Sequence, residues 1–186
     1  MTLSIPAFHQ FPKEAELIGR ILIGYGEIEY SMLTALGAVL GDQNVTVKVM
    51  YRTRGEEQRL EIADALMRHE FEKVSLSGPY CEAMADAHWC RRIRNQYAHS
   101  HFDSYDGVLS FSDLEETAKQ KPQTTHVKRR PLKLSLLQEQ EAYFGYVQWC
   151  WFFLGKEYQK KAGSISIHDA TLPKKVPRPL LHSGPP

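Results

Sequence analysis

Residues 13–40 read KEAELIGRILIGYGEIEYSMLTALGAVL and form a long amphipathic pattern. Apolar side chains recur in it every three or four positions, which is the period of a helix with one buried face. Pro12 suits the first turn of this helix, and Gly41-Asp42 suits its end. The stretch therefore predicts a long helix that packs one face against the rest of the fold. Its apolar positions are Ile18, Ile21, Leu22, Tyr25, Ile28, Met32, Ala35, Leu36 and Val39.

Two shorter helical segments are expected next along the chain. Residues 45–51 alternate like a strand, but no pairing strand lies nearby, so we interpret them as helix. A break is expected near Gly55. The apolar series from Leu60 to Val74 then has the helical period again, and it predicts a helix after that break.

Two capping signals open the remaining helices. The Ser-Gly-Pro of 77–79 places a capping serine before a first-turn proline, and it predicts a helix that runs to near His99. The Ser-Leu-Leu-Gln of 135–138 fits a capping box that opens the last helix. Between them, 107–111 has the character of a short strand or turn, with 131–134 as its partner. Together these segments predict an all-α bundle of about four core helices with a small β-hairpin or loop insertion before the last helix.

The chain of 186 residues divides into one helical domain and a tail. We expect the domain over 1–162 and an extended tail over 163–186, because 171–186 holds five of the ten prolines. The longest apolar stretch, 147–154, is far shorter than the roughly 20 residues of a membrane span, and we expect no membrane partner. Three cysteines without a CxxC pattern predict free thiols and a cytoplasmic setting.

Charge is balanced overall but unevenly distributed. Lys plus Arg total 23 against 22 Asp plus Glu, which excludes a strongly basic protein that coats nucleic acid. Positive charge gathers in 90–101 and in 119–133, and the second run holds six basic residues and no acid. That run is a solvated loop unless it folds toward the first, where Arg129 and Arg130 would contact an RNA backbone.

The stretch 90–101, CRRIRNQYAHSH, carries the groups that chemistry on RNA would need. A guanidinium can hold a phosphodiester through two parallel hydrogen bonds and stabilise charge that develops on it. A histidine can take or give a proton near neutral pH. Cleavage of RNA without a metal requires these two actions, because a base removes the 2′-hydroxyl proton and a cation stabilises the transition state.

Helix geometry separates some of these side chains. On an ideal helix Arg94 and His99 lie about 140° apart, so they do not share a face. Arg92, Asn95 and His99 share one, and Arg94 shares another with His101 if the helix lasts that far. A complete site would therefore draw on the same segment of a second copy across a two-fold axis.

The string RNQYAH at 94–99 resembles the R-N-x-x-x-H form of the R-x4-6-H motif of HEPN domains. HEPN domains are all-α bundles, and the resemblance spans roughly 13–160, although only the six-residue motif is specific. Many members are metal-independent endoribonucleases that act as toxins, in phage defence or in RNA processing. They typically dimerise so that two motifs face one another. The resemblance implies that Arg94 and His99 are the catalytic pair and Asn95 the supporting polar residue.

The same resemblance implies partners and further contacts. We expect an RNA substrate, a homodimer, no cofactor and no metal, with an antitoxin or another protein as a further candidate partner. His101 also fits the looser spacing, so the working histidine is His99 or His101. The residues expected to contact RNA are Arg91, Arg92, His101, Arg129 and Arg130.

Alternative hypotheses accompany this one. A non-catalytic module of the same fold would bind nucleotide, RNA or a partner protein. A metal site at His88, His99 and His101 is disfavoured, because arginines surround it and no second ligand cluster appears. Glu29, midway along the first helix, is a candidate ion-pair partner for Arg94. The aromatic group of 149–153 is expected to form core or a dimer face rather than a platform for bases.

Overall fold

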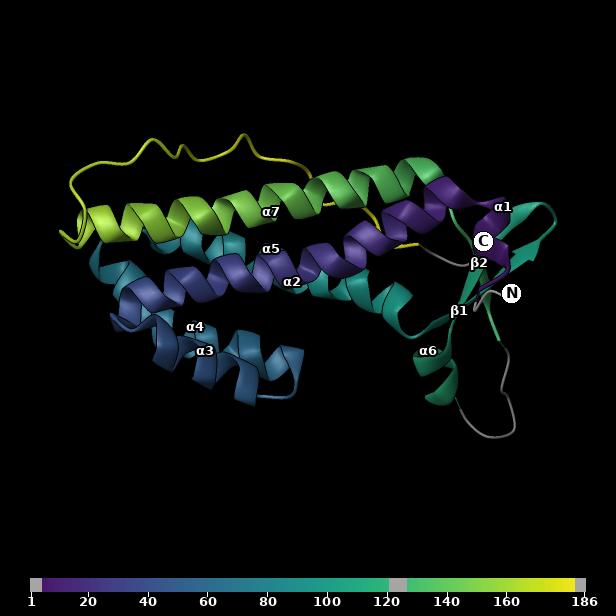
Figure 1. The fold of residues 1–186 in the computed structure, drawn as a ribbon, viewed down its shortest axis with the longest axis horizontal. Helices are drawn as coiled ribbons and strands as arrows, with labels where there is room; N and C mark the ends of the chain where they lie inside the picture. Colours follow the sequence, from purple (N-terminus) through teal and green to yellow (C-terminus); the bar gives the residue numbers. More distant parts are fainter. Residues whose placement is uncertain (1–4, 121–126, 183–186) are drawn as a thin grey trace.

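Two long helices, α2 (Pro12–Leu40) and α7 (Leu134–Lys161), form the spine of the molecule. The computed structural model describes residues 5–120 and 127–182. The two helices run parallel to one another, although the long middle part of the chain separates them in sequence (Figure 1). The expected apolar face of α2 is confirmed, since seven of its nine positions are buried and Leu22 and Val39 are half-buried.

Close contacts fix how these two helices pack. A Cβ added at Gly24 would lie 3.4 Å from the Phe144 ring, and one added at Gly155 would lie 3.3 Å from the Ala35 Cα. Gly155 is therefore the position where the backbones approach most closely, because the neighbouring atom there is main chain. Two other glycines inside the α2 pattern, Gly19 and Gly26, have no atom within 4 Å of an added Cβ.

The middle of the chain folds into helices that flank the spine. Helix α2 ends at Gly41, whose φ of 69° is left-handed, and α3 (Gln43–Arg52) follows at once. Asp42 caps α3, because its carboxylate accepts hydrogen bonds from two backbone N–H groups. The helical interpretation of 45–51 is confirmed, and so is the break near Gly55, after which α4 (Glu56–Lys73) begins.

Both serine caps expected from the sequence are wrong by one or two residues. Helix α5 (Ser77–Ala98) already includes Ser77, and α7 begins one residue before Ser135. Ahead of α5, Ser75 has a φ of 59°, and the Leu76 N–H bonds the Phe71 carbonyl at 2.8 Å. This Schellman motif closes α4 and leads directly into α5, so no residue is left to act as a side-chain cap.

A three-stranded antiparallel sheet lies at one end of the helices (Figure 1). Its strands are β1 (Ser100–Tyr105), β2 (Val108–Asp113) and β3 (Arg129–Pro131), in the order β1-β2-β3. The expected pairing of β2 with the segment before the last helix is present, with Phe111 opposite Arg130. Strand β1 was not expected. It begins two residues after α5 ends at Ala98, which agrees with the helix end expected near His99.

The remaining elements are short or irregular. Helix α1 (Ala7–Gln10) precedes the spine, and α6 (Leu114–Ala118) follows β2. From 165 to 182 the chain has no helix or strand, yet it lies along the bundle rather than leaving it (Figure 1). The Trp149 indole donates to the Thr171 carbonyl at 3.1 Å, and the Trp89 indole donates to the Pro179 carbonyl at 3.0 Å.

The fold is mainly helical with one small sheet. Its core is built by the facing sides of α2, α4, α5 and α7, where the largest buried side chains include Trp151 and Tyr80. Within the aromatic group of 149–153, Trp151 belongs to this core, whereas Trp149 and Phe152 remain partly exposed. In the part of the chain that the structure describes, no helix combines the length and the apolarity that crossing a membrane requires.

Candidate functional site

A cavity of about 660 Å³ lies where the end of α5 faces the start of α4. Four of the residues expected at the functional site line it together: Arg91, Arg94, Asn95 and His99. The opposite wall comes from the α3–α4 connection and the first turns of α4. The residues of that wall are Arg54, Gly55, Glu56, Glu57, Gln58 and Glu61. We call this cavity the α4–α5 cleft.

The end of α5 explains how His99 reaches the cleft. The last helical residue is Ala98, and His99 has a φ of −116° and a ψ of 24°, outside the helical region. The angle between Arg94 and His99 on a continuous helix therefore does not apply. Both side chains line the α4–α5 cleft of a single chain. His101 lies beyond this point on β1 and does not share a helical face with Arg94.

Arg94 is held by two oxygen atoms at the cleft wall. Its Nη1 lies 3.1 Å from Glu56 Oε1 and 3.1 Å from Asn95 Oδ1. Glu29 is not its partner, contrary to the sequence hypothesis. The carboxylate of Glu29 instead binds Arg59 on α4 through two hydrogen bonds of 2.8 and 3.2 Å. Arg59 belongs to the neighbouring helix, and its pairing with Glu29 could not be predicted from the spacing of residues in the sequence.

The second arginine of the cleft is also paired. Arg91 Nη2 lies 3.0 Å from Glu57 Oε1, while the Arg91 Nε is buried without a hydrogen-bond partner among the described residues. Arg54 and Glu61 have no ion-pair partner in the described part of the chain. The cleft thus carries three arginines and three glutamates, and two of the arginines are already neutralised.

Four other expected site residues lie away from the cleft lining. The Arg92 guanidinium lies 4.6 Å from the centre of the Trp89 ring, and His101 is exposed on β1. Arg129 pairs with Asp103 at 2.8 Å, and Arg130 pairs with Glu116. The basic run of 119–133 is therefore partly neutralised by its own neighbours, and its Lys121 lies outside the described residues.

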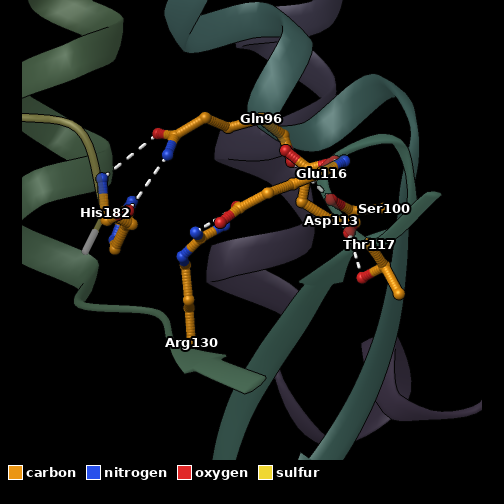
Figure 2. Close-up of polar contacts among 7 residues, drawn as sticks. All are labelled: Gln96, Ser100, Asp113, Glu116, Thr117, Arg130 and His182. Carbon is orange, nitrogen blue, oxygen red and sulfur yellow. Dashed lines mark hydrogen bonds and ion pairs between the residues drawn. The ribbon is translucent and has the colours of Figure 1, made fainter. Parts of the chain in front are cut away.

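Two other residues of the motif, Gln96 and Tyr97, contact the C-terminal segment, and Figure 2 shows Gln96 pointing toward His182. The side-chain amide of Gln96 donates to the His182 carbonyl at 3.0 Å, and the His182 N–H donates to its amide oxygen at 3.1 Å. Tyr97 is buried, donates to Gln140 and lies 2.8 Å from His182 Nδ1. We call residues 178–182 the strap, because they cross the motif helix on this side.

The His182 side chain is fixed as a neutral imidazole. Its Nε2 accepts a hydrogen bond of 3.2 Å from the Lys133 N–H, so the proton resides on Nδ1 and is donated to the Tyr97 hydroxyl. Burial lowers the pKa of His182 to about 4 and raises the pKa of Tyr97 above its usual range. The strap thus relies on an uncharged histidine at neutral pH.

Hydrogen bonds and an ion pair connect the end of α5, the sheet and α6. The Ser100 hydroxyl donates to the Gln96 carbonyl, and Asp113 caps α6 by accepting from the Glu116 N–H at 2.9 Å (Figure 2). The Arg130–Glu116 pair joins β3 to α6 (Figure 2). These contacts give the residue after His99 a fixed position.

Two findings bear on metals and on related proteins. Among residues 5–120 and 127–182, no group of three or more His, Cys, Asp or Glu side chains is arranged to hold a metal ion. The chain matches no protein-family model, and searches of curated proteins and of solved structures gave no match either. The cleft must therefore be interpreted from its own residues.

Sequence reasoning missed the six residues of the opposite cleft wall: Arg54, Gly55, Glu56, Glu57, Gln58 and Glu61. One signal for them was present, because a helix break at Gly55 places the following residues in a first turn that can face another element. Nothing in the sequence indicated that this turn would meet α5.

Proposed function

We propose that this chain is a metal-independent endoribonuclease of the HEPN type. The observation that carries the proposal is the α4–α5 cleft, whose lining combines Arg91, Arg94, Asn95 and His99 in one solvent-accessible cavity. A cation held beside a histidine is the combination that in-line attack by a 2′-hydroxyl requires. RNA is the expected substrate, and the protein is expected to act in the cytoplasm.

In the proposed reaction, His99 takes the proton of a ribose 2′-hydroxyl. The freed oxygen attacks the adjacent phosphorus, and the bond from phosphorus to the 5′-oxygen of the next nucleotide breaks. The products are a 2′,3′-cyclic phosphate and a 5′-hydroxyl, with the 5′-oxygen taking a proton from an acid. Arg94 stabilises the charge on the phosphoryl oxygens, and Asn95 orients Arg94 through the 3.1 Å contact.

A homodimer is part of the proposal. Of the two histidines at the end of the motif, only His99 lines the cleft of the described chain, so the acid for the leaving oxygen has to come from elsewhere. A second copy that faces the cleft would supply another His99 for that step. In a toxin–antitoxin or phage-defence setting, an antitoxin or another protein would act by covering the same cleft.

The test is cleavage of single-stranded RNA in excess EDTA. We expect cleavage to persist, to leave 2′,3′-cyclic phosphate ends, and to fall by about 100-fold or more in His99→Ala. His101→Ala is the matched control, since His101 is an exposed histidine on β1 outside the cleft lining. Equal activity of His99→Ala and the parent protein would refute the assignment. Loss of activity in His101→Ala alone would move the role to that residue.

The second candidate is a non-catalytic helical module that binds RNA, nucleotide or a partner protein. The observation that favours it is the pairing of Arg91 and Arg94 with glutamates, which leaves less positive charge free for catalysis. Expression in a bacterial host separates the two candidates. A nuclease should slow growth, and the His99→Ala variant should relieve that effect. A binding module should be tolerated and should bind RNA without consuming it.

A further inference from the structure

The two arginine–glutamate pairs of the cleft differ in how firmly the carboxylate is held. In the Arg94–Glu56 pair both side chains are largely shielded, with 26% and 22% of their surface exposed. In the Arg91–Glu57 pair the arginine is 18% exposed, but the glutamate is 61% exposed. The Arg91 guanidinium is thus fixed in the wall, while the carboxylate that covers it stands in solvent.

A buried ion pair between α4 and α2 shows what a permanent contact looks like here. Arg59 and Glu29 are joined by two hydrogen bonds, and their side chains are 13% and 9% exposed. Glu57 makes one contact of 3.0 Å with Arg91. An ion pair whose carboxylate is exposed adds little to stability, so the Glu57 carboxylate can be displaced at little cost to the fold.

A phosphate group is a stronger partner for the same guanidinium than Glu57. A phosphodiester can take two parallel N–H bonds from one guanidinium, whereas Glu57 makes a single contact with Arg91. The Arg91 Nε is buried without a hydrogen-bond partner among the described residues, so contact with a ligand from solvent falls to the Nη2 atom that Glu57 now occupies. The neighbouring guanidinium of Arg94 lines the same cleft and would donate hydrogen bonds to further oxygen atoms of the ligand.

We propose that Glu57 is an exchangeable counter-ion that occupies Arg91 until a phosphate of the ligand displaces it. The identity of that ligand as RNA rests on the proposed function. Glu57 then selects against weak ligands. A ligand with a single weak anionic group gains less free energy at Arg91 than the loss of the Arg91–Glu57 ion pair costs. Glu56 differs, since it is shielded and holds Arg94 in position together with Asn95.

The exchange also predicts how binding depends on salt. Each phosphate neutralised by a cationic side chain contributes about 0.7 to the slope of log affinity against log salt for a single strand. When phosphate displaces Glu57, the freed carboxylate remains beside the ligand and offsets part of that neutralisation. Replacing Glu57 with glutamine should therefore both tighten binding and steepen the salt dependence.

The test measures binding by fluorescence anisotropy with a single-stranded RNA whose 2′-oxygens are methylated, so that it cannot be cut. We expect Glu57→Gln to bind about fivefold more tightly than the parent at low salt, which corresponds to one exposed ion pair. Glu61→Gln is the matched control, because Glu61 lines the same cleft without an ion-pair partner in the described chain. It should tighten binding less. In an Arg91→Gln background the Glu57→Gln effect should disappear.

The proposal is overturned if Glu57→Gln and Glu61→Gln have equal effects, if Glu57→Gln weakens binding, or if its effect persists without the Arg91 guanidinium. A second probe, inorganic pyrophosphate followed through the arginine Nε–H signals by NMR, separates this result from the fate of the proposed function. Stronger pyrophosphate binding by Glu57→Gln supports the exchange even if the protein leaves unmodified RNA intact. Failure of both probes to bind Glu57→Gln more tightly overturns it.

Discussion

The two sides of the C-terminal end of α5 are built on opposite principles. On the cleft side, Arg94 and His99 are accessible, and the arginine is held by a glutamate and an asparagine at the surface. On the strap side, Gln96 and Tyr97 have their polar groups matched by His182 and by the buried Gln140. One short motif is thus divided between residues available for chemistry and residues that stabilise the fold, and substitutions on the two sides should behave differently.

The largest expected effect is on the cleft side. Arg94→Gln should lower RNA cleavage by about 100- to 1000-fold, because it removes the charge that stabilises the transition state. Its melting temperature should fall only slightly, because the glutamine amide can still donate a hydrogen bond to the Glu56 carboxylate. Arg52→Gln, an exposed arginine at the end of α3 outside the cleft lining, is the control. A large loss of stability in Arg94→Gln would contradict the division between the two sides.

A smaller effect, of a different kind, is expected on the strap side. Tyr97→Phe removes a hydroxyl that contacts both Gln140 and His182, so buried polar atoms lose a partner. Urea denaturation should show a loss of about 1 to 3 kcal/mol in the free energy of unfolding. RNA binding by the folded fraction should be unchanged. Tyr105→Phe, at a tyrosine that is 54% exposed on β1, serves as the control and should have almost no effect.

The strap should also make stability depend on pH. The pKa of His182 is about 4 in the folded chain, below the value of about 6.5 expected when it is unfolded. The unfolded state therefore binds the proton more readily, and stability present above pH 6.5 is lost as the pH falls toward 4. Urea denaturation of the parent and of His182→Gln at pH 7 and pH 4.5 measures this. The parent should lose more stability between the two pH values, and equal losses would show that His182 does not titrate as described.

The smallest effect is expected at Arg92, which lies on neither side of the division. Its guanidinium stacks on Trp89, whose indole holds the strap through Pro179. Arg92→Gln should reduce the free energy of unfolding by about 0.5 to 1 kcal/mol, the value of an exposed cation–π contact. RNA binding should change little. A marked loss of binding would return Arg92 to the set of RNA contacts expected from the sequence.

Much of the helical framework could be predicted from the sequence, because helical period and breaking residues are local signals. The apolar face of α2 and the break near Gly55 follow from such signals. Residues 45–51 alternate like a strand, and their helix was expected only because no pairing strand lies nearby. The hairpin between β1 and β2 had a local signal too, in the Asp106-Gly107 pair. Both residues have positive φ, as a two-residue hairpin turn requires. It was missed because the strand or turn expected over 107–111 was paired only with 131–134, and 100–105 was not considered as a strand.

The candidate site was predictable only in part. The motif gave the residues that α5 contributes, whereas the partners of Arg91 and Arg94 come from α4, more than thirty positions earlier in the chain. Choosing Glu56 over Glu29 for Arg94 depends on how α2, α4 and α5 pack, and no spacing rule carries that information. The strap was missed for the same reason. The sequence of an extended, proline-rich segment does not indicate which side chains of the fold it will contact.

The strap also has a consequence for the order in which the protein is completed. Gln96 and its partner His182 are separated by 86 residues in sequence. A chain is synthesised from its N-terminus, so the motif helix exists well before the segment that holds it. The close contact between Ala35 on α2 and Gly155 on α7 likewise forms only after α7 has been synthesised. Such distant contacts slow folding, because the chain loses the entropy of loop closure before the contacts stabilise it. The cleft and the strap that supports its helix would thus be complete only after synthesis had passed His182.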